Sequence, residues 1–305
     1  MARAQADGPL EAAQAALVSR LAPATRVQQL SWSAGETQVL ELGEGPPLVL
    51  VHGGGDGAYE WVPFMPLLAQ EHRVLAVDRP GHGLADPFEY EGVDLAAHAA
   101  TFLTGILDAL DLGAVDMLSN SIGGWWCATF ALDQPHRVRR LVIAGHPPGV
   151  TRDAPLPLRV IGLPLVGKPL GRKLLGSPSR EASRKFWGQV LVAHPERLID
   201  EFLDVDVEHM RRNRDSALSL VRRVVGPRGV RKDLLLGHRW LELAVPTLFV
   251  HGDRDTFMSG KVEAAWQAIA ESNPNVQVSS VAGAGHLPWL DEPDLVLAAV
   301  SSFLN

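Results

Sequence analysis

The sequence predicts an α/β fold, in which a mostly parallel central sheet carries helices on both faces and a helical segment is inserted as a cap. Two observations lead to this fold class. Short apolar, β-branched segments alternate with helical patterns over 27–146 and 241–305, as in parallel sheets whose strands are joined by helices. Residues 147–240, rich in Pro, Gly and Arg, break the alternation and carry amphipathic helical patterns instead.

Apolar runs locate the strands of the predicted sheet. Four of the six runs are nearly continuously apolar, as strands buried on both faces are. The predicted strands are 47–51, 73–77, 115–118, 140–144, 246–250 and 276–281. The predicted helices between or after them are 94–110, 122–133, 261–271 and 293–303. A hairpin of 27–32 and 37–42 is expected to precede the parallel strands.

An extra helix is expected within residues 1–25, because apolar residues recur there at helical spacing. This helix is expected to pack on the body of the protein or on a second copy of the chain, and the second arrangement would make a homodimer. The resulting domain division is a core of residues 1–146 and 241–305 and a helical cap of residues 147–240.

Composition argues against several classes of protein. The net charge of −7 disfavours a nucleic-acid binder. No run of 18 or more apolar residues occurs, so no membrane span is expected, and polar residues interrupt the N-terminus where a signal peptide is continuously apolar. The single cysteine, Cys127, cannot form an intrachain disulfide, which is compatible with the cytoplasmic location that we expect.

The charges are unevenly distributed along the chain. Residues 147–240 hold 18 Lys/Arg against 10 Asp/Glu, whereas the rest of the chain holds 10 against 25. The cap arginines could attract an anionic substrate, or they could lie on solvated helix faces and pair with neighbouring acids, which we favour. The arginines concerned are Arg211, Arg212, Arg214, Arg222 and Arg223.

A candidate nucleophile lies in the segment "LSNSIGGWW" over 118–126, between a predicted strand and a predicted helix. A nucleophilic serine on such a sharp turn needs small residues two positions before and after it. Ser121 has Ser119 and Gly123 at these positions, whereas a nucleophile at Ser119 would have Met117 at one of them. Ser121 is therefore the predicted nucleophile, although the same serine could merely cap a helix.

The partners of Ser121 are expected in loops that follow other strands. "VHGGGDG" over 51–57 is a glycine-rich loop that brings backbone N–H groups close to a substrate oxygen, and Gly54 and Ile122 are the predicted oxyanion donors. One such donor is worth roughly 3 kcal/mol in the transition state. "VHGDRDTFM" over 250–258 offers two carboxylates, and "GAGHLPWLDEP" over 283–293 offers His286.

The motifs "HGGGDG", "DRPGHGLAD", "NSIGG", "HGDRD" and "GHLPWLDEP", in this order, resemble the α/β-hydrolase superfamily, in the branch with a helical cap. The resemblance covers the chain apart from the cap and the N-terminal helix. It implies that Asp255, counted from Gly252 in G-x-x-D, is the acid that orients His286. His286 would take the proton of Ser121, and an acyl-enzyme would form and be hydrolysed.

The expected activity is hydrolysis of an ester or related acyl bond of a small molecule, with no cofactor and no metal. One cysteine and the absence of an H-E-x-x-H motif disfavour a zinc site. Besides the triad, we expect several residues to contact substrate from the glycine loop, the turn and the later loops. These residues are Gly55, Trp61, Asn120, His146, Leu287 and Trp289.

Two alternatives remain open from the sequence. The first is carbon–carbon bond hydrolysis of a vinylogous diketone acid, because "HGGGDGA" and "NSIGG", with Asn120, resemble hydrolases that cleave ring-fission products. Pro63 and Leu287 stand where that subgroup has Asn and Trp, which weakens this resemblance. The second is a non-catalytic ligand receptor on the same fold, because the fold does not determine function.

Overall fold

The computed structural model describes residues 8–305. Its centre is an eight-stranded sheet in the order β1-β2-β4-β3-β5-β6-β9-β10, in which β1, β2 and β4 pair antiparallel and the other neighbours pair in parallel. The strands are β1 (Arg26–Trp32), β2 (Gly35–Leu42), β3 (Pro47–Val51), β4 (Arg73–Val77), β5 (Val115–Asn120), β6 (Val138–Ala144), β9 (Thr247–Gly252) and β10 (Val276–Val281). The predicted fold class is therefore confirmed.

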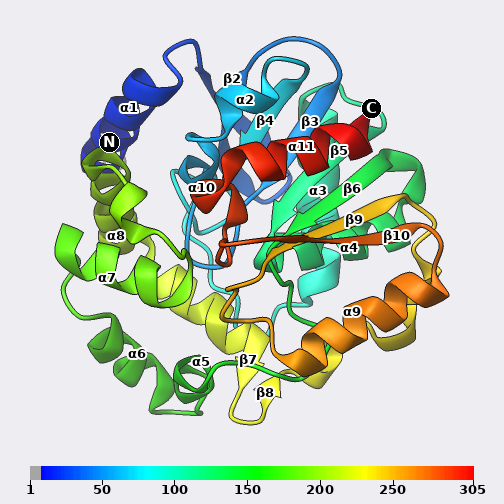
Figure 1. Ribbon diagram of the computed structural model, residues 1–305. Coiled ribbons are helices and arrows are strands. Elements are labelled where there is room, and N and C mark those ends of the chain that lie inside the picture. Colours follow the sequence, from blue (N-terminus) through cyan, green and yellow to red (C-terminus); the bar gives the residue numbers. More distant parts are fainter. Residues whose placement is uncertain (1–7) are drawn as a thin grey trace.

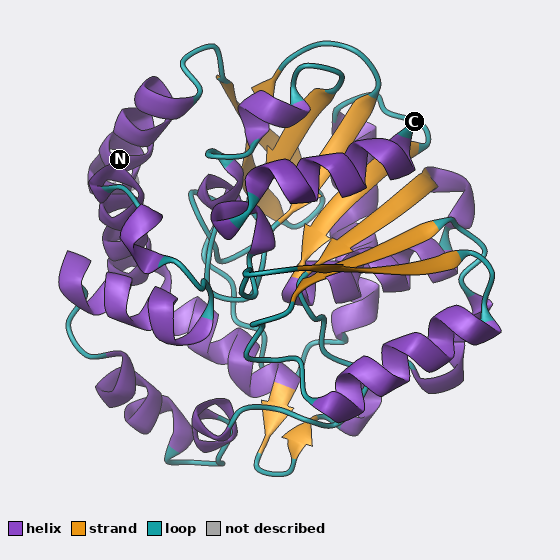
Figure 2. Cartoon of the chain, viewed as in Figure 1, coloured by secondary structure: helices purple, strands orange, loops and turns teal. Residues whose placement is uncertain are grey.

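Helices cover both faces of the sheet, as Figure 2 shows. Along β3, Val49 and Val51 point into one hydrophobic cluster and Leu48 and Leu50 into another, as side chains that alternate across a strand must. The first cluster includes residues of α3 (Leu95–Ala109), α4 (Ser121–Asp133) and α9 (Gly260–Ser272). The second includes residues of α1 (Gly8–Leu21), α2 (Met65–Leu68), α10 (Pro288–Asp291) and α11 (Pro293–Leu304).

The segment between β6 and β9 is mostly helical and lies on one side of the sheet (Figure 1). It contains α5 (Leu156–Ile161), α6 (Gly167–Leu175), α7 (Arg180–Val190) and α8 (Asp200–Val224). It also contains a small antiparallel hairpin of β7 (Val225–Gly226) and β8 (Gly229–Val230) that the sequence did not predict, because strands of two residues have no readable periodicity. The division into core and cap stays a prediction.

The longest helix, α8, joins this segment to the core. Phe202 and Leu203, near its start, belong to one core cluster, and Leu220 and Val224, near its end, belong to the other. In the part of the chain that the structure describes, no helix is both long and apolar enough to cross a membrane.

The predicted N-terminal helix corresponds to α1, while residues 1–7 lie outside the described part of the chain. Leu10 and Leu17 are buried, and Arg20 forms an ion pair of 2.6 Å with Glu201 of α8. The Gln38 side chain of β2 donates a hydrogen bond of 3.2 Å to Gln14. Helix α1 therefore packs on the body of the same chain, between the sheet and α8.

Candidate active site

The predicted nucleophile lies where β5 turns into α4. Ser121 is the first residue of α4 and has a φ of +50°, a left-handed conformation that is uncommon for residues other than glycine. Such strain at a strand-to-helix turn is typical of a nucleophile held above a sheet. A Cβ added to Gly123 would lie 2.4 Å from the carbonyl oxygen of His52, so α4 can approach β3 only with glycine there.

Ser119 replaces the glycine that usually precedes such a turn, and the structure shows how its hydroxyl is accommodated. The side chain is fully buried, and its Oγ donates a hydrogen bond of 2.9 Å to the carbonyl oxygen of Val142 in the neighbouring strand β6. Because the buried hydroxyl has a partner, it carries little of the desolvation penalty that an unpaired polar group would.

Asp255 and His286 meet at the same edge of the sheet. Nδ1 of His286 lies 2.9 and 3.0 Å from the two carboxylate oxygens of Asp255. The carboxylate also accepts hydrogen bonds from the backbone N–H groups of His146 (3.2 Å) and Phe257 (2.8 Å). Burial opposes ionisation of Asp255, but His286 and the Phe257 N–H outweigh it and hold the pKa of the carboxyl below its ordinary value.

Asn120 connects the serine turn to the histidine loop. Its side-chain amide donates to the carbonyl oxygens of Ala144 (2.7 Å) and His286 (3.3 Å), and the residue is 1% exposed. Gly145 lies between them with a φ of +76°, and a Cβ there would lie 2.3 Å from the carbonyl oxygen of His286. The three segments that carry Ser121, Gly145 and His286 are thus in direct contact.

The glycine-rich loop leaves space beside Ser121. A Cβ at Gly55 would meet no heavy atom within 4 Å, and one at Gly54 would meet only the side chain of Ile122, at 3.5 Å. Ile122 lies in the first turn of α4, where backbone N–H groups lack intrahelical acceptors. The loop therefore leaves room for a substrate group beside Ile122, and Gly54 and Ile122 stay predicted oxyanion donors.

Two buried basic residues hold this loop in place. Nδ1 of His52 donates to the carbonyl oxygen of Gly53 (2.9 Å), and its Nε2 accepts the backbone N–H of Arg79 (2.9 Å). The guanidinium of Arg79 donates to the carbonyl oxygens of His52 (3.2 Å) and Gly53. Burial and the Arg79 charge lower the pKa of His52 well below its ordinary value, so the ring stays neutral.

The other predicted substrate contacts are buried in the structure. Trp61 and Trp289 stack on each other with ring centroids 4.0 Å apart, and the indole of Trp289 donates to the carbonyl oxygen of Glu60. Nδ1 of His146 accepts a hydrogen bond of 3.4 Å from Trp266. The backbone N–H of Leu287 donates to the carbonyl oxygen of Leu191, in the segment between β6 and β9.

A group of buried carboxylates beside the glycine loop was not predicted. Tyr59 donates to Asp206 of α8 (3.0 Å) and lies 3.4 Å from Asp56, while Glu60 accepts the backbone N–H of Gly53 (3.3 Å). Burial, reinforced by the Asp206 carboxylate, raises the pKa of Asp56 to about 7. A sequence signal did exist, because Glu60 stands alone among apolar and aromatic residues in "AYEWVPF".

The raised pKa of Asp56 predicts a pH-dependent stability. Since the folded chain binds the proton more tightly, the associated stability is present below the ordinary pKa of 3.8 and is lost as the pH rises through about 7. At pH 8 we expect the free energy of unfolding of Asp56→Asn to exceed that of the wild type by on the order of 2 kcal/mol. At pH 4 the two proteins should differ little in stability.

Urea titrations from pH 4 to pH 8 measure this effect. Asp111→Asn provides the matched control, because it makes the same substitution at an exposed carboxyl, away from the buried group. Burial also raises the pKa values of Glu60 and Asp206, so the free energy of unfolding of Asp56→Asn should still fall somewhat as the pH rises. Parallel profiles for Asp56→Asn and the wild type would contradict a buried, protonated Asp56.

Several arginines considered as attractors of an anionic substrate are engaged elsewhere. Arg211 pairs with Glu208, Arg222 with Glu91 at 2.5 Å, and Arg223 with Asp233 at 2.6 Å. Arg212 donates to the carbonyl oxygens of Gly83 and Ala85 in the core. These contacts favour the structural interpretation of the cap arginines.

Comparisons with known proteins identify the family of the chain. A sequence model of the alpha/beta hydrolase family matches residues 48–299. A 2-hydroxy-6-oxononadienedioate/2-hydroxy-6-oxononatrienedioate hydrolase of Cupriavidus pinatubonensis is 32% identical over 247 residues, 78% of this chain and 80% of the relative. A 2-hydroxy-6-oxo-2,4-heptadienoate hydrolase of Pseudomonas putida is 43% identical, over 36% of this chain and 41% of its own length.

Solved structures share the fold at lower identity. Carboxylesterase CesB from Bacillus subtilis superimposes with a TM-score of 0.76 at 20% identity and covers 98% of both chains. A meta-cleavage product hydrolase from Pseudomonas fluorescens superimposes with a TM-score of 0.71 at 22% identity, over 91% of this chain and 97% of that one. With the family model matching most of its length, the chain belongs to the alpha/beta hydrolase family.

Proposed function

We propose that the protein hydrolyses an ester or related acyl bond of a small molecule, with Ser121 as nucleophile, His286 as base and Asp255 as the acid that orients it. The observation that carries the proposal is the hydrogen-bonded Asp255–His286 pair, joined through Asn120 to a serine held at a φ of +50°. This arrangement suits acyl transfer, because a serine hydroxyl is a weak nucleophile until a base accepts its proton.

Each of these residues has one part in the proposed reaction. The Ser121 oxygen attacks the substrate carbonyl while His286 takes its proton, and Asp255 stabilises the resulting imidazolium. The N–H groups of Gly54 and Ile122 stabilise the oxyanion, and the glycines at 54 and 55 leave room for the substrate. His286 then protonates the leaving group and activates the water that releases the acyl group.

We assign different parts to the other predicted contacts. Gly55 and the Leu287 loop remain candidates for contact with the substrate. Asn120 and His146 act as positioning residues in this proposal, because their described hydrogen bonds go to the protein. Trp61 and Trp289 form a stacked support under the glycine loop.

Carbon–carbon hydrolysis of a vinylogous diketone acid is the second candidate. Its support is the 32% identity to a 2-hydroxy-6-oxononadienedioate/2-hydroxy-6-oxononatrienedioate hydrolase. Pro63 and Leu287, which stand where that subgroup of hydrolases has Asn and Trp, favour the ester.

A substrate panel distinguishes the two candidates. We expect turnover of p-nitrophenyl esters of some acyl length at rates well above that of a vinylogous diketone acid, and covalent labelling of Ser121 by a fluorophosphonate. Faster turnover of the diketone acid would select the second candidate. The absence of a Ser121 adduct on the folded protein would contradict both and favour a ligand receptor.

A further inference from the structure

The segment of α5, α6 and the turn between them exposes apolar side chains at a corner of the molecule. Leu165 is 94% exposed and Leu156 is 69% exposed, and Leu165 has a φ of +63°, which an L residue with a branched side chain rarely adopts. Val166 and Leu170 are also exposed. Neighbouring exposed apolar residues usually mark a surface that binds something.

The β7–β8 hairpin lies beside α5, as Figure 1 shows, and a Cβ at Gly162, where the turn begins, would lie 2.4 Å from the carbonyl oxygen of Val225 in β7. Nε of Arg159 in α5 donates a hydrogen bond of 2.9 Å to the carbonyl oxygen of Pro227 in the hairpin. Nη1 of Arg222 donates to the carbonyl oxygen of Leu163, at 3.1 Å. The apolar turn and the hairpin therefore form one surface, which we call the cap corner and define as residues 152–173 and 222–232.

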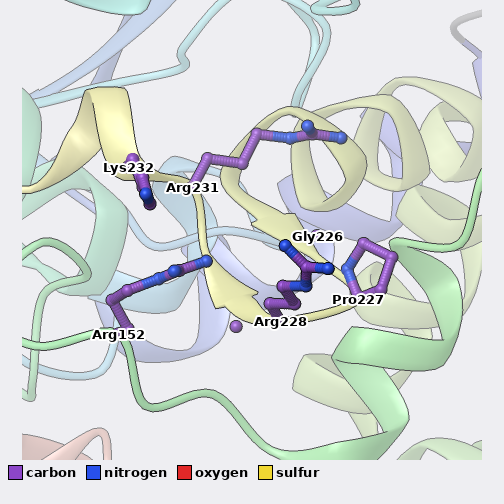
Figure 3. Close-up of a pocket in the computed structure, with 7 residues that line it drawn as sticks. Arg152, Gly226, Pro227, Arg228, Arg231 and Lys232 are labelled. Atoms are coloured by element: carbon purple, nitrogen blue, oxygen red, sulfur yellow. The ribbon is translucent and has the colours of Figure 1, made fainter.

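The cap corner is strongly basic although the chain as a whole is acidic. Its two segments hold ten Lys/Arg and a single acidic residue, Asp153, in a chain of net charge −7. Four of these cations pair with acids outside the two segments, which leaves six without an ion pair among the described residues. The paired cations are Lys168, Arg172, Arg222 and Arg223. A surface pocket of about 430 Å³ lies at the hairpin (Figure 3), and no acidic side chain lines it. The cations that line it are Arg152, Arg228, Arg231 and Lys232.

The charges in this pocket are not neutralised by neighbours. Asp233, the acid next to Lys232, pairs with Arg223, and Asp153 accepts a hydrogen bond from Ser259. Among the residues that the structure describes, Arg228 and Lys232 have no anionic partner. The pocket is therefore suited to an anionic group such as a phosphate.

We propose that the cap corner docks the protein on the surface of an anionic phospholipid bilayer. Phosphate groups would occupy the basic pocket, and Leu156 and Leu165 would enter the boundary between headgroups and acyl chains. Exposed apolar residues next to uncompensated cations are the combination that binds such a surface. A soluble phosphate would leave the apolar turn uncovered, and a symmetric contact between two copies would bring like charges together.

Sedimentation with vesicles tests the proposal. Wild-type protein should sediment with phosphatidylglycerol–phosphatidylcholine vesicles, far less with pure phosphatidylcholine, and less as salt rises. Leu165→Asp and the double variant Arg228→Glu/Lys232→Glu should each weaken binding about tenfold or more. Leu295→Asp, at an exposed leucine of α11, and Lys261→Glu, on α9, are matched controls that should bind like the wild type.

Several results would overturn the proposal. They are equal binding to both kinds of vesicle, no binding to either, or wild-type binding by both cap-corner variants. If the protein binds inorganic phosphate in calorimetry but does not sediment with vesicles, the pocket is a site for a soluble anion instead. A dimer that Leu165→Asp dissociates would identify a contact between copies. Ester hydrolysis in solution is a separate readout, so its absence would contradict the proposed function and leave this test intact.

Discussion

Ser121→Ala is expected to lower kcat by about 10⁴-fold or more while the protein stays folded. Removing the hydroxyl removes the atom that would form the acyl-enzyme, and what remains is the oxyanion site and substrate binding. Stability should change little, because alanine keeps the Cβ and the same left-handed backbone at φ +50°. Steady-state hydrolysis of the best ester of the panel, beside a urea titration, measures both quantities.

Ser119→Ala is the matched control for this experiment. It removes a hydroxyl two residues away in the same turn, where Oγ donates to the carbonyl oxygen of Val142. We expect a loss of about 1 kcal/mol of stability and a kcat within a few-fold of the wild type. A Ser121→Ala protein that kept more than about 1% of the activity would refute the role of Ser121. An inactive Ser119→Ala protein would show that we had assigned the nucleophile to the wrong serine.

Gly145→Ala is expected to give the largest loss of stability, on the order of 3–5 kcal/mol. The new methyl group would lie 2.3 Å from the carbonyl oxygen of His286 and 2.7 Å from the side-chain nitrogen of Asn120, at a φ of +76°. The histidine loop would have to move, so kcat should fall as well, even though Gly145 contacts no substrate in our proposal.

Gly113→Ala provides the comparison, because a Cβ at Gly113 would meet no heavy atom within 4 Å. Chemical unfolding and kcat measurements of both variants should show a loss of stability and of kcat for Gly145→Ala and little change for Gly113→Ala. Equal stability of Gly145→Ala and Gly113→Ala would show that the contact between Gly145 and the histidine loop is not as close as described.

The arrangement of strands was predictable because apolar runs and glycine-rich loops are local signals. The same signals indicated Ser121, Asp255 and His286, since each follows a strand whose carboxyl end lies at one edge of the sheet. Their catalytic roles stay part of the proposal. What sequence could not indicate was the accommodation of Ser119, because its partner Val142 lies in another strand, 23 residues away.

Contacts between residues far apart in the sequence explain the other differences between the predicted site and the structure. Asp56 and Asp206 lie on either side of Tyr59 only because α8 folds back over the glycine loop, 147 residues after Tyr59. Trp61 and Trp289 were expected to contact substrate, and the stack that they form depends on α10 packing against the segment that follows the glycine loop. A residue type and its neighbours in sequence do not specify such a partner.

Helix α1 connects two parts of the chain that a cap movement would separate. Gln14 bonds to Gln38 in the sheet, and Arg20 pairs with Glu201 at the start of α8. If α8 moved outward to admit a substrate, the ion pair between Arg20 and Glu201 would break and α8 would lose its contacts with α1. Helix α1 therefore ties the start of α8 to the sheet, and in our proposal its release would accompany any opening that exchanges product for substrate.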